Sequence, residues 1–115
     1  MAEITGITPQ IKDKERCNIE VDGRFFCGMK LETVVKHRLK VGVAVSEEEL
    51  SRMQLESEKL TALDKALTFI TASMKTEKDI RAYLRKKGYL EDISGYVVEK
   101  MRSYGYLDDA AYARA

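Results

Sequence analysis

The sequence has no tryptophan, one proline, one histidine and two cysteines among its 115 residues. Two cysteines are too few for the disulfide framework of a small secreted domain, and they have no metal-ligand spacing. We therefore interpret Cys17 and Cys27 as small buried hydrophobic residues. His37 stands among cations with no second soft ligand cluster, so we expect a solvated surface residue and no metal site.

Long hydrophobic runs and catalytic motifs are also missing. No apolar stretch approaches the roughly 20 residues of a membrane helix, and residues 1–8 lack the basic start and apolar core of a signal peptide. We therefore expect a cytoplasmic protein. There is no glycine-rich phosphate loop and no nucleophile motif. The adjacent Asp108 and Asp109 are better interpreted as helix caps than as an acid–base pair, so we expect a protein that is not an enzyme.

The composition indicates a soluble globular protein with one ordinary domain or two very small ones. Hydrophobic residues make up 44% of the chain and charged residues 34%. The net charge of +1 conceals an asymmetry. Residues 1–58 hold 9 basic and 11 acidic side chains, whereas residues 59–115 hold 11 and 8. This basic excess is smaller than in most proteins that live on nucleic acid alone.

Alternating apolar and polar side chains over residues 16–21 predict a β-strand, because a half-buried strand has a period of two. The dipeptide Asp22-Gly23 accepts the positive φ values of a type I′ turn and predicts a hairpin with a return strand over residues 24–29. Isoleucines within residues 4–11 indicate a preceding strand, which Pro9 confines to an edge or a bulge. Three antiparallel strands suffice if a helix covers one face.

The register of this hairpin decides where the two cysteines point. A two-residue turn pairs Ile19 with Phe26 and Cys17 with Gly28. Cys27 then lies on the face opposite Cys17, which argues against an intrachain disulfide.

Helical spacing replaces the alternation after residue 30. The first apolar set at this spacing is Leu31, Val34, Val35 and Leu39. Cations within residues 36–40 suit the carboxyl end of a helix, which we expect Gly42 to end. Ser46 and Glu49 form a capping box for the next segment, which either continues into the following helix or breaks near Ser57.

Residues 61–106 predict three helices. The apolar stripe of the first consists of Leu63, Ala66, Leu67, Ile70 and Met74. The second is capped by Thr76 and Asp79, and its inner face is Ile80, Tyr83 and Leu84. The third is capped by Asp92, and its inner face is Ile93, Val97, Met101 and Tyr104. We therefore expect an α+β fold: a small antiparallel β-hairpin or meander with a helix, followed by a three-helix repeat of a tandem helical array.

A five-residue segment occurs twice, as Gly88-Tyr89-Leu90-Glu91-Asp92 and as Gly105-Tyr106-Leu107-Asp108-Asp109. Each glycine can take the left-handed conformation past a helix end, which costs a residue with a Cβ about 1–2 kcal/mol. The Tyr-Leu pair can pack back on the finished helix, and the acid can cap the next. Short helices joined by matching corners are typical of a helical array. The chain stops within a predicted fourth helix, so we expect the natural protein to continue.

Several segments, in this order and at this spacing, resemble the RecX family of recombination regulators. The matching segments are Ala66-Leu67, residues 76–84, residues 86–89, residues 104–109 and Tyr112-Ala113. The amino-terminal part is similar to extensions seen in some members, at residues 4–7, 16–23 and 46–50. The resemblance therefore spans nearly the whole chain.

The resemblance implies a regulator that binds the RecA recombinase filament on single-stranded DNA and inhibits it, modulating homologous recombination and the SOS response. It also implies no catalytic residues and no cofactor. It predicts a β-rich domain at 1–45, a capped helix or linker at 46–60, the first three-helix repeat at 61–106 and a truncated second repeat at 107–115. Family members usually carry three such repeats, and only the first is complete here.

The candidates for partner contact are basic and aromatic residues of the second and third helices of this repeat. They are Arg81, Arg85, Lys86, Lys87, Tyr96, Lys100 and Arg102. The run at 85–87 suits an acidic groove or a phosphate backbone, although cations at a helix end also interact favourably with the helix dipole. Tyr96 lies near the edge of its apolar stripe and is expected to be partly exposed. Tyr83, Tyr104 and Tyr112 lie on apolar stripes and are interpreted as core.

Two alternatives remain open. The second and third helices, joined at Gly88, could form a direct DNA-binding module resembling a helix-turn-helix. The tyrosine-rich third helix argues against this, because a recognition helix normally presents polar groups to the bases. The other alternative is a structural helical adaptor with an unrelated partner.

Overall fold

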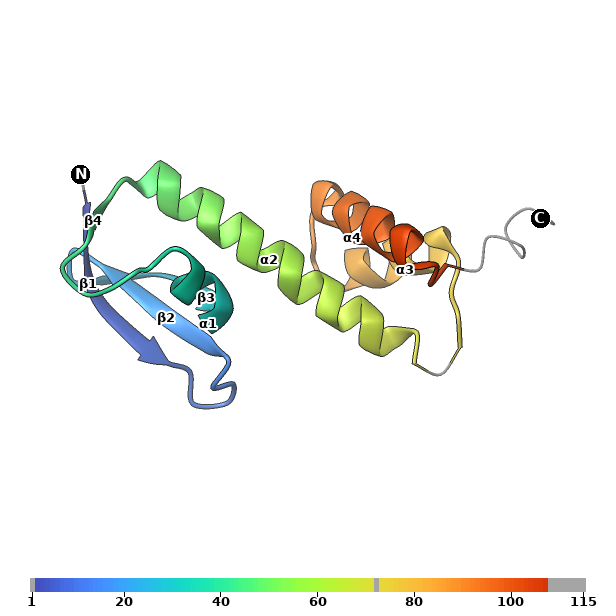
Figure 1. Cartoon of the computed structure of the whole chain (residues 1–115), viewed down its shortest axis with the longest axis horizontal. Coiled ribbons are helices and arrows are strands. Elements are labelled where there is room, and N and C mark those ends of the chain that lie inside the picture. The colour runs from blue at the N-terminus through green and yellow to red at the C-terminus, as the bar shows by residue number, and fades with distance from the viewer. Residues whose placement is uncertain (1, 72, 108–115) are drawn as a thin grey trace. The chain divides into compact units, whose positions relative to one another are not determined.

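The computed structural model describes residues 2–71 and 73–107 of the chain. Within this part the fold is α+β, as predicted, with a four-stranded antiparallel sheet and four helices (Figure 1). The chain divides into two compact units, Met1–Glu58 and Lys59–Ala115. The predicted caps Asp108 and Asp109 and the predicted core residue Tyr112 lie outside the described residues.

The sheet of the first unit contains β1 (Ala2–Pro9), β2 (Arg16–Val21), β3 (Arg24–Lys30) and β4 (Ala44–Val45) in the order β3-β2-β1-β4. Three of these strands are those predicted from the sequence. The additional β4 pairs only with Ala2 and Glu3 of β1. Pro9, the last residue of β1, therefore lies where β1 has no second neighbour, so its missing N–H costs no ladder hydrogen bond.

A β-bulge changes the predicted register of the hairpin. Asp22 and Gly23 take φ values of 50° and 82°, as a type I′ turn requires. Glu20 pairs with Phe25, but Ile19 pairs with Cys27, so Phe26 is the extra residue. The predicted pairs Ile19–Phe26 and Cys17–Gly28 are therefore wrong. The shift turns Cys27 and Met29 into the core, where Met29 is fully buried.

Both cysteines lie in this core, on the same face rather than on opposite faces. Both are buried, and neither forms a disulfide. In the sheet Cys17 is the cross-strand neighbour of Met29, and Cys27 is the neighbour of Ile19. Burial raises the pKa of Cys17 above its ordinary value, and it raises the pKa of Cys27 to about 11. The two thiols therefore stay protonated near neutral pH, in agreement with their interpretation as hydrophobic residues.

The helix after β3 is shorter than predicted. Helix α1 spans Leu31–Lys36 and ends well before Gly42, because Arg38 turns the chain with a φ of 53°. The buried residues of the predicted stripe are Val34 and Leu39, whereas Leu31 and Val35 are exposed. The core of this unit joins α1 to the sheet and to the start of α2 through Ile4, Ile19, Met29, Val34 and Leu50.

His37 has a partner, contrary to the prediction of a solvated residue. Its Nε2 lies 2.7 Å from the carboxylate of Glu56, which also pairs with Lys36. Hydrogen bonds from Lys36 and then His37 lower the pKa of Glu56. These contacts fasten the end of α1 to the part of α2 that belongs to the first unit.

Helix α2 spans Glu47–Phe69 without a break at Ser57. The hydroxyl of Ser46 accepts a hydrogen bond from the Glu49 N–H at 3.1 Å, as the predicted cap requires. The buried Ser57 hydroxyl accepts from the Lys30 N–H at 2.8 Å. Met74, predicted on the apolar stripe of this helix, lies beyond its end and is half exposed, so that prediction is wrong.

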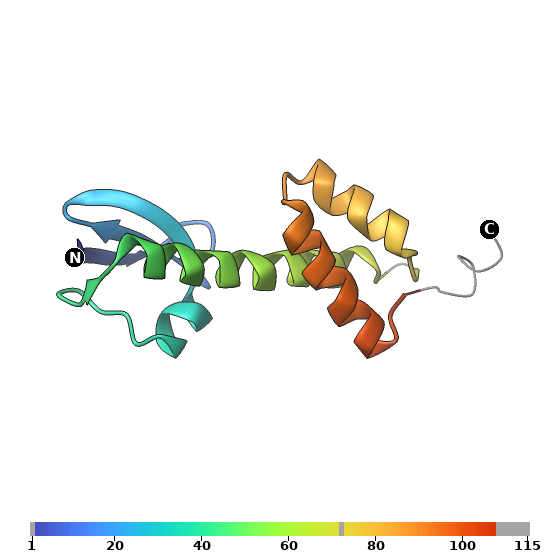
Figure 2. The same cartoon turned by 90° about the horizontal axis from the view of Figure 1, so that it is seen from above.

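The second unit packs α3 (Glu77–Lys86) and α4 (Glu91–Tyr104) against the carboxyl-terminal part of α2 (Figure 2). Thr76 and Asp79 form the predicted capping box at the start of α3. The fully buried residues at the centre of the core are Ala62, Ala66, Ile80, Leu84, Val97, Val98 and Met101. Two predictions for α4 are wrong. Tyr104, predicted on the inner face, is 48% exposed. The N-cap is Leu90 rather than Asp92, and it makes no side-chain hydrogen bond.

Both predicted glycine corners are confirmed. Gly88 and Gly105 take left-handed φ values of 92° and 75°. Tyr89 donates its N–H to the Leu84 carbonyl at 3.0 Å, and the residue after Gly105 donates to the Met101 carbonyl at 2.9 Å. These are the six-residue hydrogen bonds of Schellman motifs, which satisfy carbonyls left open at helix ends.

The side chains at the two corners differ, so the expected packing of each Tyr-Leu pair is only half right. At the first corner Tyr89 packs against the core and Leu90 is exposed. At the second corner Tyr106 is exposed and Leu107 is buried.

Candidate partner-binding surface

Three arginines of the second unit form a network with glutamates. Arg81 pairs with Glu77, one turn earlier on α3, at 3.0 Å, and with Glu91 at the start of α4 at 3.3 Å. Arg85 pairs with the same Glu91 at 3.0 Å. Arg102 reaches Glu77 from α4. Glu77 and Glu91 each hold two arginines, and the network links α3 to α4.

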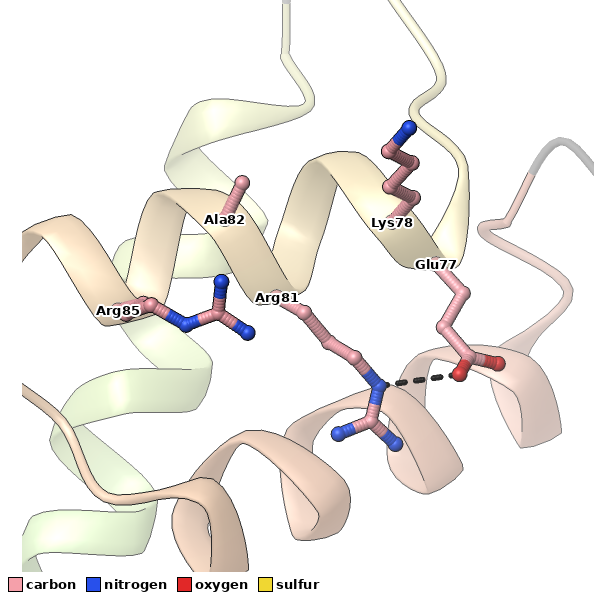
Figure 3. A pocket seen from close by; sticks show the side chains of 5 residues that line it. All are labelled: Glu77, Lys78, Arg81, Ala82 and Arg85. Carbon is pink, nitrogen blue, oxygen red and sulfur yellow. Dashed lines mark hydrogen bonds and ion pairs between the residues drawn. The ribbon is translucent and has the colours of Figure 1, made fainter.

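The network changes the electrostatics expected from the sequence. The predicted basic group includes Arg81 and Arg85, but carboxylates partly neutralise both. The surface of α3 therefore has a shallow pocket of mixed charge. It is lined by Glu77, Lys78, Arg81, Ala82 and Arg85 (Figure 3). Arg102 has a second carboxylate partner in Glu99. Arg85 remains 70% exposed and Arg81 32%, so Arg85 is the more accessible of the two.

Hydrogen bonds in this network lower the pKa of the Glu77 carboxyl. The bond from Arg81 is the largest cause, and the bond from Arg102 acts in the same direction. A carboxyl whose pKa is lower in the folded state than in the unfolded state stabilises the fold at pH values above its ordinary pKa of 4.5. This contribution is lost as the pH falls through the pKa of the folded state.

Replacing Glu77 by glutamine should therefore have an effect that depends on pH. At pH 7 we expect the free energy of unfolding to fall by less than about 1 kcal/mol, because the pairs are partly exposed and screened. The difference from the unchanged chain should be smaller at about pH 3, because the contribution of the ion pairs is lost as pH falls through the lowered pKa of Glu77. Urea unfolding at both pH values measures it. An equal difference at both would show that the ion pairs do not contribute.

The remaining candidates are lysines and one tyrosine. Lys86 and Lys87 are exposed at the end of α3, and the Lys87 Nζ lies 5.7 Å from the centre of the Tyr83 ring. Tyr96 is half-buried, as predicted, and its ring is flanked by two ammonium groups. The Nζ of Lys59 and of Lys100 lie 5.4 Å and 5.9 Å from its centre. The candidates thus occupy two surfaces, one on α3 with Arg102 and one around Tyr96.

Sequence reasoning missed the two glutamates that organise the arginines. The four-residue spacing of Glu77 and Arg81 on one helix was a usable signal, because such residues are neighbours on a helix surface. No such signal marks Glu91, which lies ten and six residues from Arg81 and Arg85, across the corner at Gly88. Only the turn of the chain brings it to them.

No group of three or more metal-binding side chains is arranged to hold an ion within residues 2–71 and 73–107. None of the helices in these two stretches is both long and apolar enough to cross a membrane.

A curled antiparallel sheet with a short helix, followed by three helices of which the last two meet at a Schellman corner, defines a class of α+β proteins with a three-helix unit. Residues 2–46 match the regulatory protein RecX N-terminal domain, and residues 62–101 match the RecX first three-helix domain. The chain belongs to the RecX family.

Whole-chain similarities agree with this assignment. The chain is 38% identical to the regulatory protein RecX of Clostridium acetobutylicum, over 96% of this chain and 51% of the relative. The chain is 35% identical to the regulatory protein RecX of Lacticaseibacillus paracasei, over 98% of this chain and 47% of the relative. A crystal structure of regulatory protein RecX superposes with a TM-score of 0.69 at 27% identity, covering 98% of this chain and 55% of the other. The chain thus spans about half the length of these relatives.

Proposed function

We propose that this chain regulates homologous recombination and the SOS response by binding the RecA recombinase filament on single-stranded DNA and inhibiting it. Binding, rather than catalysis, is the proposed mode of action, with no cofactor and in the cytoplasm. The observation that carries the proposal is the repeated Schellman corner at Gly88 and Gly105. Such corners join short helices into an array that presents one continuous surface.

The proposed organisation follows the repeats. Residues 1–45 form the β-rich domain, and 46–60 hold the capped first part of α2. Residues 61–106 form the first three-helix repeat, which begins with the rest of α2, and 107–115 are the start of a second. Several repeats acting together strengthen binding along a filament, because each bound repeat raises the effective concentration of the next.

The proposed contact residues are Arg81, Arg85, Lys86, Lys87, Tyr96, Lys100 and Arg102. Because the arginines are engaged with glutamates, the exposed lysines are the more direct test of contact. Lys86 and Lys100 are exposed and have no carboxylate partner among the described residues, so changing them leaves the ion-pair network intact.

Replacing Lys86 and Lys100 together by glutamate should weaken binding to RecA filaments on single-stranded DNA roughly tenfold, because reversed charges oppose an acidic groove. Light scattering measures binding, and strand exchange measures inhibition. The matched control is the double change Lys12→Glu and Lys14→Glu, two exposed lysines of the first unit. An equal loss in both variants would contradict the assigned surface. Absence of binding by the unchanged chain at micromolar concentration would contradict the function.

A direct reader of duplex DNA is the alternative. Helix α4 would be its recognition helix, since it follows the turn at Gly88. The charged residues of α4 are Glu91, Asp92, Glu99, Lys100 and Arg102. Acids outnumber bases on this helix, which opposes its approach to phosphates. Salt-dependent binding of naked duplex with sequence preference would favour this alternative.

A further inference from the structure

The basic side chains of the second unit fall into two groups with different partners. The three described arginines lie against glutamates. Five lysines instead lie over aromatic rings, and they are Lys59, Lys65, Lys75, Lys87 and Lys100. The lysine charge of this unit is therefore concentrated beside aromatic rings, apart from the ion-pair network.

The densest of these contacts is a four-layered stack between α2 and α3. The rings of Phe69 and Tyr83 are parallel within 7°, with centres 4.2 Å apart. The Nζ of Lys75 lies 5.1 Å from the Phe69 centre, and that of Lys87 lies 5.7 Å from the Tyr83 centre. Because each ring turns one face to the other ring, each ammonium lies on an outer face.

A further lysine–ring contact lies at the first glycine corner. Lys65 lies one helical turn before Phe69 on α2, and its Nζ is 5.5 Å from the centre of the Tyr89 ring. Phe69, Tyr83 and Tyr89 are each half-buried and pack against the core from outside. We call Lys65, Phe69, Lys75, Tyr83, Lys87 and Tyr89 the aromatic–lysine surface. The sequence predicted Tyr83 as a core residue. Tyr83 packs against the core but is only partly buried, and its ring also belongs to this surface.

We propose that the aromatic–lysine surface binds single-stranded nucleic acid. An ammonium over an exposed ring is held more weakly than a base stacked on the same ring. A base can therefore displace Lys75 or Lys87 from its ring, and the released ammonium can pair with a neighbouring phosphate. Every base has a flat face, so such binding tolerates many sequences.

The chemistry favours a single strand over two other anionic partners. A duplex keeps its bases stacked on one another, so it exposes phosphates and base edges but no free base face on which a ring could stack. An acidic peptide would satisfy the lysines in the same way and leave the rings unused. The parallel, partly buried rings of Phe69 and Tyr83 distinguish the surface from an ordinary cluster of lysines.

This inference goes beyond the proposed function, since it concerns a free strand and a surface that excludes Lys86 and Lys100. The test measures binding of a labelled oligothymidine of about 12 nucleotides by fluorescence anisotropy, at low salt because phosphate contacts are screened by salt. The double change Lys75→Gln and Lys87→Gln should weaken binding at least fivefold. The matched control, Lys12→Gln with Lys14→Gln, removes the same charge from two exposed lysines of the first unit with no ring contact among the described residues and should weaken it less than twofold.

Two further measurements separate stacking from charge attraction. An abasic oligonucleotide of the same length should bind roughly tenfold more weakly than oligothymidine, because it cannot stack. Because the sequence has no tryptophan, its emission comes from six tyrosines, of which Tyr83 and Tyr89 lie on this surface, and it should be partly quenched on binding. Equal binding of the abasic strand, equal losses in the two double variants, or full competition by polyglutamate would each overturn the proposal, as would no binding at about 100 µM.

Discussion

Replacing Leu84 by alanine should unfold the second unit while the first unit keeps its sheet. Leu84 is fully buried among residues of α2, α3 and α4. Deleting a buried leucine side chain costs about 2–5 kcal/mol, since lost transfer free energy is joined by the cavity left behind. A single small core rarely supplies more than about 3–5 kcal/mol, so most of the unit's stability would be lost.

The first unit should survive because its core has no residue in common with that of the second. Its buried centre includes Ile4, Ile19, Met29 and Leu50. Amide spectra should therefore keep the dispersed signals of β1, β2 and β3 and lose those of α3 and α4. Leu90→Ala is the control, because the same deletion at a 69% exposed leucine should change stability by less than about 0.5 kcal/mol. Simultaneous loss of all amide signals would show that the two units unfold as one.

The same substitution at two glycines of the second unit should have opposite effects on stability. Gly88→Ala should lower the free energy of unfolding by about 1–2 kcal/mol, because a residue with a Cβ is strained at a φ of 92°. Gly95→Ala should raise it by about 0.5–1 kcal/mol, because alanine is the better helix former inside α4. An added Cβ meets nothing within 4 Å at either position, so packing does not distinguish them.

Urea unfolding of the two variants measures this difference directly. The variants differ from the unchanged chain by one methyl group each, so the slopes of the transitions should agree and only the midpoints should move. The free energies of unfolding should differ by roughly 1.5–3 kcal/mol between the two variants. Equal midpoints would show that the left-handed corner at Gly88 does not constrain the fold.

Sequence reasoning succeeded where a feature depends on residues a few positions apart. The capping box of Thr76 and Asp79, the type I′ turn at Asp22-Gly23 and both glycine ends were predicted, and each is present. In these features the interacting groups are neighbours along the chain, so their chemistry can be inferred from spacing alone.

Predictions from the sequence failed where contacts with distant segments decide the local conformation. Nothing between Arg24 and Met29 signals a bulge, which follows from the gain of burying Cys27 and Met29 beside Ile19. Strand β4 has only two residues, too few for an alternating pattern, and it exists because β1 lies beside it.

The candidate site shows the same division. The basic residues and Tyr96 were found from composition and helical spacing. The glutamates that pair with the arginines were not found, because Glu91 reaches Arg81 only after the chain turns at Gly88. Phe69 stacks on Tyr83 only because α2 and α3 pack together.

The sequence by itself determined the α+β class, the glycine corners after α3 and α4, and the family, because these depend on hydrophobic period and glycine positions. Tertiary structure alone decided which side of β3 enters the core, which arginines are neutralised and which lysines lie over rings. The physical reason is that burial and ion pairing depend on distances in space, and these are set only when segments far apart in the chain pack against one another.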